Sequence, residues 1–252
     1  FKTGAKHAGE NMTEILGSRP AGQPAPIFMA DALARNFPKA VEQATKVAKC
    51  IAHGRRYFVD LEDAFPKQSQ YVLDSLGTVF FNDALARTHH LSPEDRLLFH
   101  QAFSRSIMDG LKLGMQRQLD ENTTEANGRL GKAFRYMLSN WEGLTAFLRE
   151  PGAPLENNAV ERLLKKSVLH RKNSLFYRTN RGAEIGDIYM SLIYTCELNG
   201  ADAFEYLTEL QIHANEVKAQ PARWMPWNYR DTLNHLLGIR DEHAPRASPI
   251  AA

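Results

Sequence analysis

The spacing of hydrophobic residues predicts short alternating elements in the first sixty residues of the chain. His7 to Leu16 carries apolar residues at helical spacing, and Ile27 to Ala30 is typical of a buried strand that ends at Asp31. Pro38 to Lys49 predicts a second helix, and Cys50 to Ala52 predicts a weak strand. This order indicates an α/β region, with a carboxylate delivered at the end of its first buried strand.

The pattern changes after residue 60, where long helical periods replace the short elements. They cover Tyr71 to Phe81, Pro93 to Gln118 and Leu130 to Phe147. Ser92 precedes Pro93 and two acidic residues, which is a typical helix start. No strand pattern interrupts this stretch, so the sequence predicts an inserted helical domain over residues 61–150.

The last hundred residues are also predicted to be mostly helical. Helices are expected at Leu155 to Val168, Ala183 to Leu198 and Ala203 to His213, and the Ala- and Pro-rich end at 243–252 is expected to be disordered. The predicted organisation is therefore α/β but mostly helical, in four parts: 1–60, 61–150, 151–212, and a C-terminal extension at 213–252.

Composition narrows the class of protein. The 252 residues are 24% charged and 43% hydrophobic, with a formal net charge of +2, which is ordinary for a globular protein. Cys50 and Cys196 are the only cysteines, so we expect no disulfide framework and a reducing compartment such as the cytoplasm. No run approaches the roughly 18 apolar residues of a membrane span. Phe1 to Gly4 resembles the end of a strand, which predicts a truncated N-terminus.

Positive charge is concentrated after Glu161. Between residues 162 and 181 there is no Asp or Glu, although the segment carries seven basic side chains. Such a run is equally typical of a solvated face and of a nucleic-acid site. The seven candidate DNA-binding residues are Arg162, Lys165, Lys166, Arg171, Lys172, Arg178 and Arg181.

Asp31 and Glu161 are the candidate catalytic residues and metal ligands. Carboxylates are the preferred ligands of Mg²⁺, and two such ions suit phosphodiester cleavage. Spacing alone leaves other roles open: Asp31 can cap a helix, and Glu161 has the spacing of a capping box with Asn158 and of an ion pair with Lys165.

A second group of polar residues follows the predicted strand at Cys50. His53, Arg55 and Arg56 resemble a phosphate clamp and are further candidate DNA-binding residues, although a solvated strand end explains them equally well. Cys50 and His53 also have the spacing of half a zinc site. No second half follows in the sequence, which argues against zinc.

Several blocks of sequence, taken in order, resemble the DDE transposases of the insertion sequence 66 family. The main blocks are HAGEN (7–11), MADALARN (29–36), CIAHGRRYF (50–58), LENNAVER (155–162) and HRKNSLFYRTNRGAE (170–184). Each block is weak by itself, and their joint order is specific. Together they span most of the chain apart from the helical middle and the tail.

The resemblance implies an RNase H-like core, truncated here and interrupted by a helical insertion. It implies three acids that bind two Mg²⁺ ions, with Asp31 matching the second acid and Glu161 the third. It also implies DNA partners, namely the element ends and the target, with self-association on DNA in the bacterial nucleoid. No residue matches the first Asp, so we expect an incomplete catalytic domain. Two alternatives are a non-catalytic DNA-binding remnant and a purely helical interaction protein.

Overall fold

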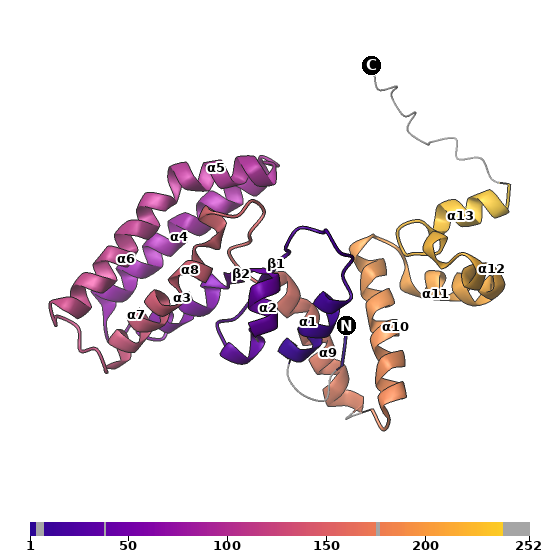
Figure 1. The fold of residues 1–252 in the computed structure, drawn as a ribbon, viewed down its shortest axis with the longest axis horizontal. Coiled ribbons are helices and arrows are strands. Elements are labelled where there is room, and N and C mark those ends of the chain that lie inside the picture. The colour runs from indigo at the N-terminus through magenta and orange to yellow at the C-terminus, as the bar shows by residue number, and fades with distance from the viewer. Residues whose placement is uncertain (4–7, 38, 175–176, 239–252) are drawn as a thin grey trace, which may run out of the picture. The chain divides into compact units, whose positions relative to one another are not determined.

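The computed structural model describes residues 1–3, 8–37, 39–174 and 177–238, which form two compact units (Figure 1). The N-terminal unit comprises residues 4–162, and the C-terminal unit comprises residues 1–3 and 163–252. The predicted tail at 243–252 lies outside the described residues. Most of the described chain is helical, as the hydrophobic pattern predicts.

A two-stranded parallel sheet lies in the N-terminal unit. Strand β1 (Ile27–Ala30) pairs with β2 (Lys46–Lys49), in a register that runs from Ile27 opposite Lys46 to Ala30 opposite Lys49. The chain before and between the strands forms α1 (Ala8–Gly17), η1 (Ala34–Asn36) and α2 (Lys39–Ala44). Helix α1 and strand β1 confirm the prediction. The RNase H-like core remains an expectation, because the described residues supply only these two strands.

The prediction of one helix from Pro38 to Lys49 is wrong in its second half. Helix α2 ends at Ala44, and Lys46–Lys49 is strand β2. Val47 and Ala48 fit a helical period, but pairing with β1 decides their conformation and leaves Ala48 fully buried. Contact with a strand that lies earlier in the sequence therefore overrides the local pattern.

The predicted strand at Cys50 to Ala52 is also wrong, because helix α3 (Ile51–Val59) begins there. Cys50 has extended backbone angles, and its N–H donates to the Ala30 carbonyl at 3.1 Å, which continues the sheet. The next residue already begins the helix. His53, Arg55 and Arg56 thus lie on a helix rather than at a solvated strand end.

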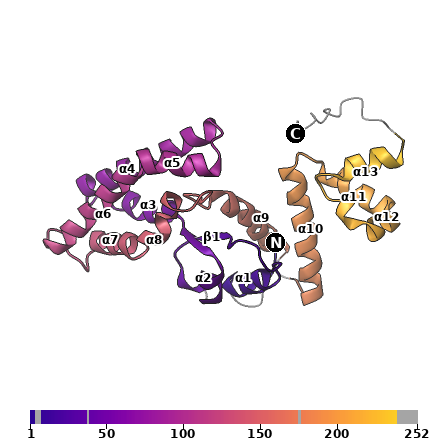
Figure 2. The same ribbon diagram turned by 45° about the horizontal axis from the view of Figure 1, so that its top comes forward.

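Residues 61–150 are all described and contain helices without any strand, as predicted. The helices α4 to α7 lie side by side with α3 in a bundle (Figures 1 and 2). Their bounds are α4 Pro66–Thr88, α5 Pro93–Phe103, α6 Arg105–Asp120, α7 Arg129–Ser139, α8 Trp141–Leu144 and η2 Ala146–Leu148. Ser92 caps α5 by accepting a hydrogen bond from the Asp95 N–H at 3.1 Å.

One hydrophobic core joins the bundle to the sheet. Ala48 of β2 and Ile51 of α3 belong to the same cluster of buried side chains as Leu76, Met108 and Phe134 of the bundle. All five of these side chains are completely excluded from solvent. The sheet is too small to bury a core of its own, so it depends on the helices for burial.

Helix α9 (Asn158–Ser174) begins in the N-terminal unit and continues into the C-terminal unit. The later elements are α10 Asn180–Leu198, α11 Ala203–Ile212, α12 Ala214–Ala219, η3 Pro221–Arg223 and α13 Tyr229–Leu236. A small core of Cys196, Tyr206, Trp224 and Tyr229 holds them together. The Tyr206 hydroxyl donates to the Trp224 carbonyl at 2.7 Å within this core.

The strand predicted at Phe1 to Gly4 is not seen at residues 1–3, and Gly4 lies outside the described residues. Thr3 instead donates from its hydroxyl to Asp187 of α10 at 2.8 Å, and the terminal amine of Phe1 donates to Ser191 at 2.8 Å. The Thr3 N–H also donates to the Asp187 carboxylate, so a side chain satisfies this backbone donor in place of a neighbouring strand.

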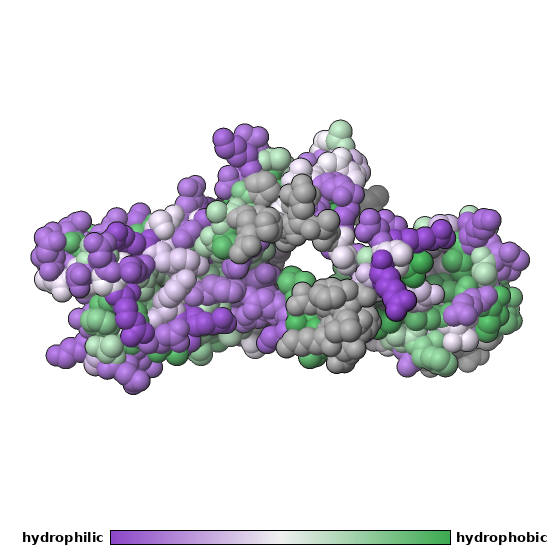
Figure 3. Space-filling model, turned by 90° about the horizontal axis from the view of Figure 1, so that it is seen from below, coloured by the Kyte–Doolittle hydropathy of each residue, from purple (hydrophilic) through white to green (hydrophobic). Residues whose placement is uncertain are grey.

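The surfaces of the two units differ in polarity. Hydrophobic side chains gather at the surface of the C-terminal unit, whereas the bundle presents a mainly hydrophilic face (Figure 3). Phe204, Leu198 and Ile212 are among the exposed apolar residues of the C-terminal unit. Within the described residues, no helix has the length and apolar character needed to cross a bilayer.

Candidate metal centre at the edge of the sheet

Asp31 follows the last residue of β1 directly, at the edge of the sheet where both parallel strands end. Ligand sites in open α/β sheets lie at this edge. The side chain is half-buried, and the Asn36 amide donates a hydrogen bond to its Oδ1. This contact with η1 orients the carboxylate at the end of its strand.

The pKa of Tyr136 reports on the same edge. Burial is the largest of the causes that raise this pKa to about 12, and the nearby groups of Tyr57, Asp31 and Cys50 contribute in that order. Asp31 and Cys50 therefore both lie within electrostatic range of one phenol from the bundle. This agrees with the sheet register, which puts the ends of β1 and β2 next to each other.

Glu161 reaches this region from the first turn of α9. Its Oε1 lies 3.5 Å from Nε2 of His53 on α3, and the two side chains are 32% and 27% exposed. Asn158 donates to Glu156 Oε2 at 2.5 Å, and Glu161 faces His53. The described structure therefore does not form the capping box that spacing leaves open.

A backbone contact holds the start of α9 against the sheet edge. The N–H of Ile51, at the beginning of α3, donates to the carbonyl of Leu155 at 3.0 Å. The Leu155 side chain is buried in the shared core. The segment around Leu155, which connects the bundle to α9, thus holds Glu161 close to the end of β2.

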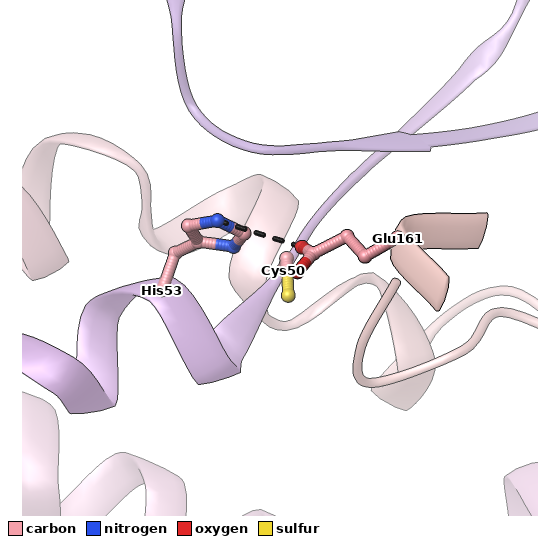
Figure 4. A group of neighbouring side chains, drawn as sticks. All are labelled: Cys50, His53 and Glu161. Atoms are coloured by element: carbon pink, nitrogen blue, oxygen red, sulfur yellow. Dashed lines mark ion pairs between the residues drawn. The ribbon is translucent and has the colours of Figure 1, made fainter. Parts of the chain in front are cut away.

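Cys50, His53 and Glu161 form one cluster of potential ligands (Figure 4). One donor atom from each residue lies within 4.8 Å of the other two. The Cys50 side chain is buried, and Nδ1 of His53 is buried without a hydrogen-bond partner in the described structure. Asp31 is not a member of this cluster, although it follows the neighbouring strand.

The sequence does not anticipate this cluster, because Glu161 lies in a distant segment. The C-x-x-H spacing of Cys50 and His53 is the one local signal. On α3 this spacing puts both residues on one side of the first turn. The third donor comes from α9 and is found only through the fold.

The basic candidates differ in how free they are to bind a polyanion. Arg56, Arg162, Lys165, Arg178 and Arg181 are exposed, and Arg55 is half-buried in a shallow cleft beside Glu62 and Asp74.

Lys166 is already engaged. Its Nζ lies 2.5 and 2.7 Å from the two carboxylate oxygens of Glu197 on α10, and 4.3 Å from the ring centre of Tyr194. An acid from outside the basic segment thus neutralises one of its charges. The side chains of Arg171 and Lys172 lie outside the described part of the chain.

Comparison with known proteins decides the family. The family model described as "Transposase IS66 family" matches residues 1–185. The chain belongs to this transposase family. The matched range contains both carboxylates, the Cys50 cluster and the whole basic segment, which confirms the resemblance seen in the sequence.

Three curated relatives come from Sinorhizobium fredii (strain NBRC 101917 / NGR234). "Uncharacterized protein y4jD" is 32% identical over 203 residues, which cover 79% of this chain and 39% of that protein. "Uncharacterized protein y4hP" and "Uncharacterized protein y4qI" are each 28% identical and are matched over 35% of their length. The chain thus spans well under half the length of these relatives. No solved structure matches it significantly.

Proposed function

We propose that this chain forms part of a DDE-type transposase, which performs metal-dependent DNA strand cleavage and transfer during transposition. The observation that carries the proposal is the position of Asp31 and Glu161. One follows β1 directly, and the other is held through Leu155 and His53 against the residues that follow β2. Support for the proposal thus comes from one carboxylate that follows β1 and another that contacts residues just after the parallel strand β2.

The donor set of Asp31 and Glu161 fits Mg²⁺, which prefers hard oxygen ligands and keeps several waters. When bound, two such ions neutralise charge on the phosphate and activate a nucleophilic water or hydroxyl. In this proposal Asn36 orients Asp31, and His53 orients Glu161. No residue of the chain matches the family's first Asp, so we expect this remaining acid to come from outside these 252 residues.

Manganese binding tests the two carboxylates without requiring catalysis. Mn²⁺ serves as a spectroscopic substitute for Mg²⁺, and the paramagnetic signal of the free ion reports its binding to the chain. Asp31→Asn and Glu161→Gln should each weaken binding by about tenfold or more, as loss of a ligand does. Asp63→Asn, at an exposed acid of the same unit, is the matched control and should bind normally.

The same proteins separate an enzyme from a DNA-binding remnant. Glu161→Gln should leave binding to a DNA duplex nearly unchanged, because its carboxylate faces the metal site. Equal Mn²⁺ affinity in all variants would favour the remnant and contradict the proposal. Mg²⁺-dependent strand transfer by these 252 residues alone would contradict the expectation that the family's first Asp lies outside them.

DNA is the proposed polyanion for the basic side chains. Lys165 is exposed, whereas Lys166 is neutralised by Glu197. Lys165→Ala should therefore lower the slope of log affinity against log salt by about 0.9 for each lost phosphate contact. Lys166→Ala should change the slope less, and an equal change would show that the Glu197 contact opens on DNA.

A further inference from the structure

We propose that Cys50, His53 and Glu161 bind Zn²⁺, and that this ion inhibits the transposase site by competing with Mg²⁺ for Glu161. The binding site itself rests on the geometry of the three side chains alone. The inhibition rests on the proposed function, because it requires Glu161 to be a ligand of the catalytic Mg²⁺.

The three donors have the chemistry of a zinc site rather than a magnesium site. Zn²⁺ takes thiolate sulfur, imidazole nitrogen and carboxylate oxygen, whereas Mg²⁺ is selected by oxygen ligands alone. Three protein ligands leave a fourth position for water, which is the arrangement of an open zinc site. Binding releases the thiol proton of Cys50 to solvent, so that a thiolate becomes the ligand.

The distances in the cluster suit tetrahedral coordination after a small contraction. Bond lengths of about 2.0 Å to nitrogen and oxygen and 2.3 Å to sulfur place neighbouring ligand atoms roughly 3.3–3.8 Å apart. The His53 Nε2 to Glu161 Oε1 distance is already 3.5 Å. The largest separation within the cluster, at most 4.8 Å, needs to shorten by about 1 Å, which side-chain rotation can supply.

Unmet hydrogen-bonding capacity at His53 supports a missing ligand. Its Nδ1 is buried without a partner in the described structure, and its Nε2 is too far from Glu161 for a good hydrogen bond. Buried polar atoms in native proteins are normally satisfied by a protein group, water or an ion. A cation on Nε2 replaces the long contact with Glu161, whereas a cation on Nδ1 gives the buried nitrogen its missing partner.

The frame around the cluster is already ordered. Cys50 is fixed by its hydrogen bond to Ala30, and Ile51 by its hydrogen bond to Leu155. Entry is from the side of His53 and Glu161, whose side chains are 27% and 32% exposed, respectively. A prearranged backbone with an accessible opening reduces the ordering that metal binding requires.

Sharing of Glu161 is the reason for competition. The carboxylate that faces His53 is the one we assign to the Mg²⁺ site, and coordination beside a thiolate draws it towards α3. Mg²⁺ demands near-ideal octahedral geometry, so a displaced ligand lowers its affinity strongly. Zn²⁺ should therefore act as an inhibitor, and high Mg²⁺ should oppose it.

Cobalt binding tests the site directly. Co²⁺ substitutes for Zn²⁺ and gives an intense thiolate-to-metal charge-transfer band when cysteine is a ligand. Titration of the reduced 252-residue chain, with a phosphine reductant that does not supply thiols, should give this band at one equivalent. Zn²⁺ should abolish it by displacement. Absence of the band would overturn the proposal.

Matched variants identify the ligands. Cys50→Ser should abolish the band, whereas Cys196→Ser, at the other buried cysteine, should retain it. His53→Gln and Glu161→Gln keep the thiol and should weaken Co²⁺ binding at least tenfold, so they test the site even if Cys50→Ser fails to fold. A band that persists in Cys50→Ser, or unchanged affinity in both of the other variants, would overturn the proposal.

Competition separates this inference from the proposed function. Rising Mg²⁺ should weaken Co²⁺ binding to the unsubstituted chain, and Co²⁺ affinity independent of Mg²⁺ would overturn the inhibitory role. Asp31→Asn should retain the Co²⁺ band, because Asp31 is outside the cluster. If Asp31→Asn leaves Mn²⁺ binding unchanged while the Co²⁺ band behaves as expected, the catalytic assignment fails and the zinc site stands.

Discussion

Two histidine–carboxylate pairs of the N-terminal unit have opposite characters. In the bundle, Nε2 of His100 lies 3.2 Å from Oδ1 of Asp83, and both side chains are almost completely buried. At the sheet edge, His53 and Glu161 lie 3.5 Å apart with roughly a quarter to a third of each side chain exposed. Only the first pair has all its ring nitrogens partnered.

The buried pair is part of a complete network. Asp83 also accepts a hydrogen bond from Arg96 Nε at 2.8 Å, and Nδ1 of His100 lies 3.0 Å from the hydroxyl of Ser104. Asn82 donates to the same hydroxyl at 3.1 Å. The order Ser, His, Asp resembles a catalytic triad, but its serine is fully buried and cannot reach a substrate.

This difference shows how a polar network that stabilises the fold can be distinguished from a site that binds a ligand. A buried polar network with every group satisfied joins α4, α5 and α6 and holds their register. A partly exposed pair whose histidine has an unpartnered ring nitrogen contributes little to the stability of the fold and can still bind a ligand. Residue types alone do not separate these roles, because both sites contain a histidine and an acid.

Removal of each acid should give the largest contrast. Asp83→Ala leaves Arg96 and His100 unpaired in the core and should lower the free energy of unfolding by about 3 kcal/mol or more. Glu161→Ala removes a partly exposed contact and should cost at most about 1 kcal/mol. Urea denaturation followed by circular dichroism measures both, and equal losses would remove the distinction.

Replacement of each histidine should give a smaller contrast in the same direction. His100→Gln breaks contacts to Asp83 and Ser104 inside the core and should cost about 2 kcal/mol. His53→Gln should stay within about 0.5 kcal/mol, as substitutions outside the core usually do. The melting temperatures of the two variants provide the check, and a more destabilising His53→Gln would reverse our assignment.

The buried pair should make the free energy of unfolding depend on pH in the acidic range. Burial by itself raises the pKa of the Asp83 carboxyl, but the hydrogen bond from His100 and the charges of Arg96 and Arg87 outweigh it, so the pKa falls below its usual 3.8. A lowered folded-state pKa stabilises the protein fully above about pH 4, and this contribution is lost as pH falls through the folded pKa.

The control for this experiment is Asp83→Asn, which cannot titrate at that position. Its free energy of unfolding should be lower near neutral pH and should fall less steeply below pH 4 than that of the unsubstituted chain. Unfolding measured in urea at a series of acidic pH values gives both curves. Parallel curves would show that other carboxylates cause the acid sensitivity.

Much of the fold follows from local patterns in the sequence. The long helices of the bundle have clear helical periods, and Ser92 caps α5 as its sequence context predicts. The conformation of Val47 and Ala48 does not follow from their neighbours, because pairing with β1 determines it. Short elements with few residues carry a weak periodic signal, so long-range contacts decide them.

The candidate site is predictable only in part, for the same reason. Asp31 is expected at a strand end, and the structure has it there. The resemblance to a known family singles out Glu161, but its contact with His53 depends on the path of the chain through the bundle. Cys50 lies near His53 through their local C-x-x-H spacing, but their contact with Glu161 depends on that path.

Because the sheet and the bundle share one core, the geometry of the candidate site at the sheet edge depends on the thermal stability of the bundle. Ile51 belongs to this core, and its backbone ties Leu155 and hence the start of α9 to the strand ends. Loosening of the bundle by heat would disperse the ligands before the whole chain unfolds. Conversely, an ion bound at the sheet edge would stabilise bundle helices that it does not contact.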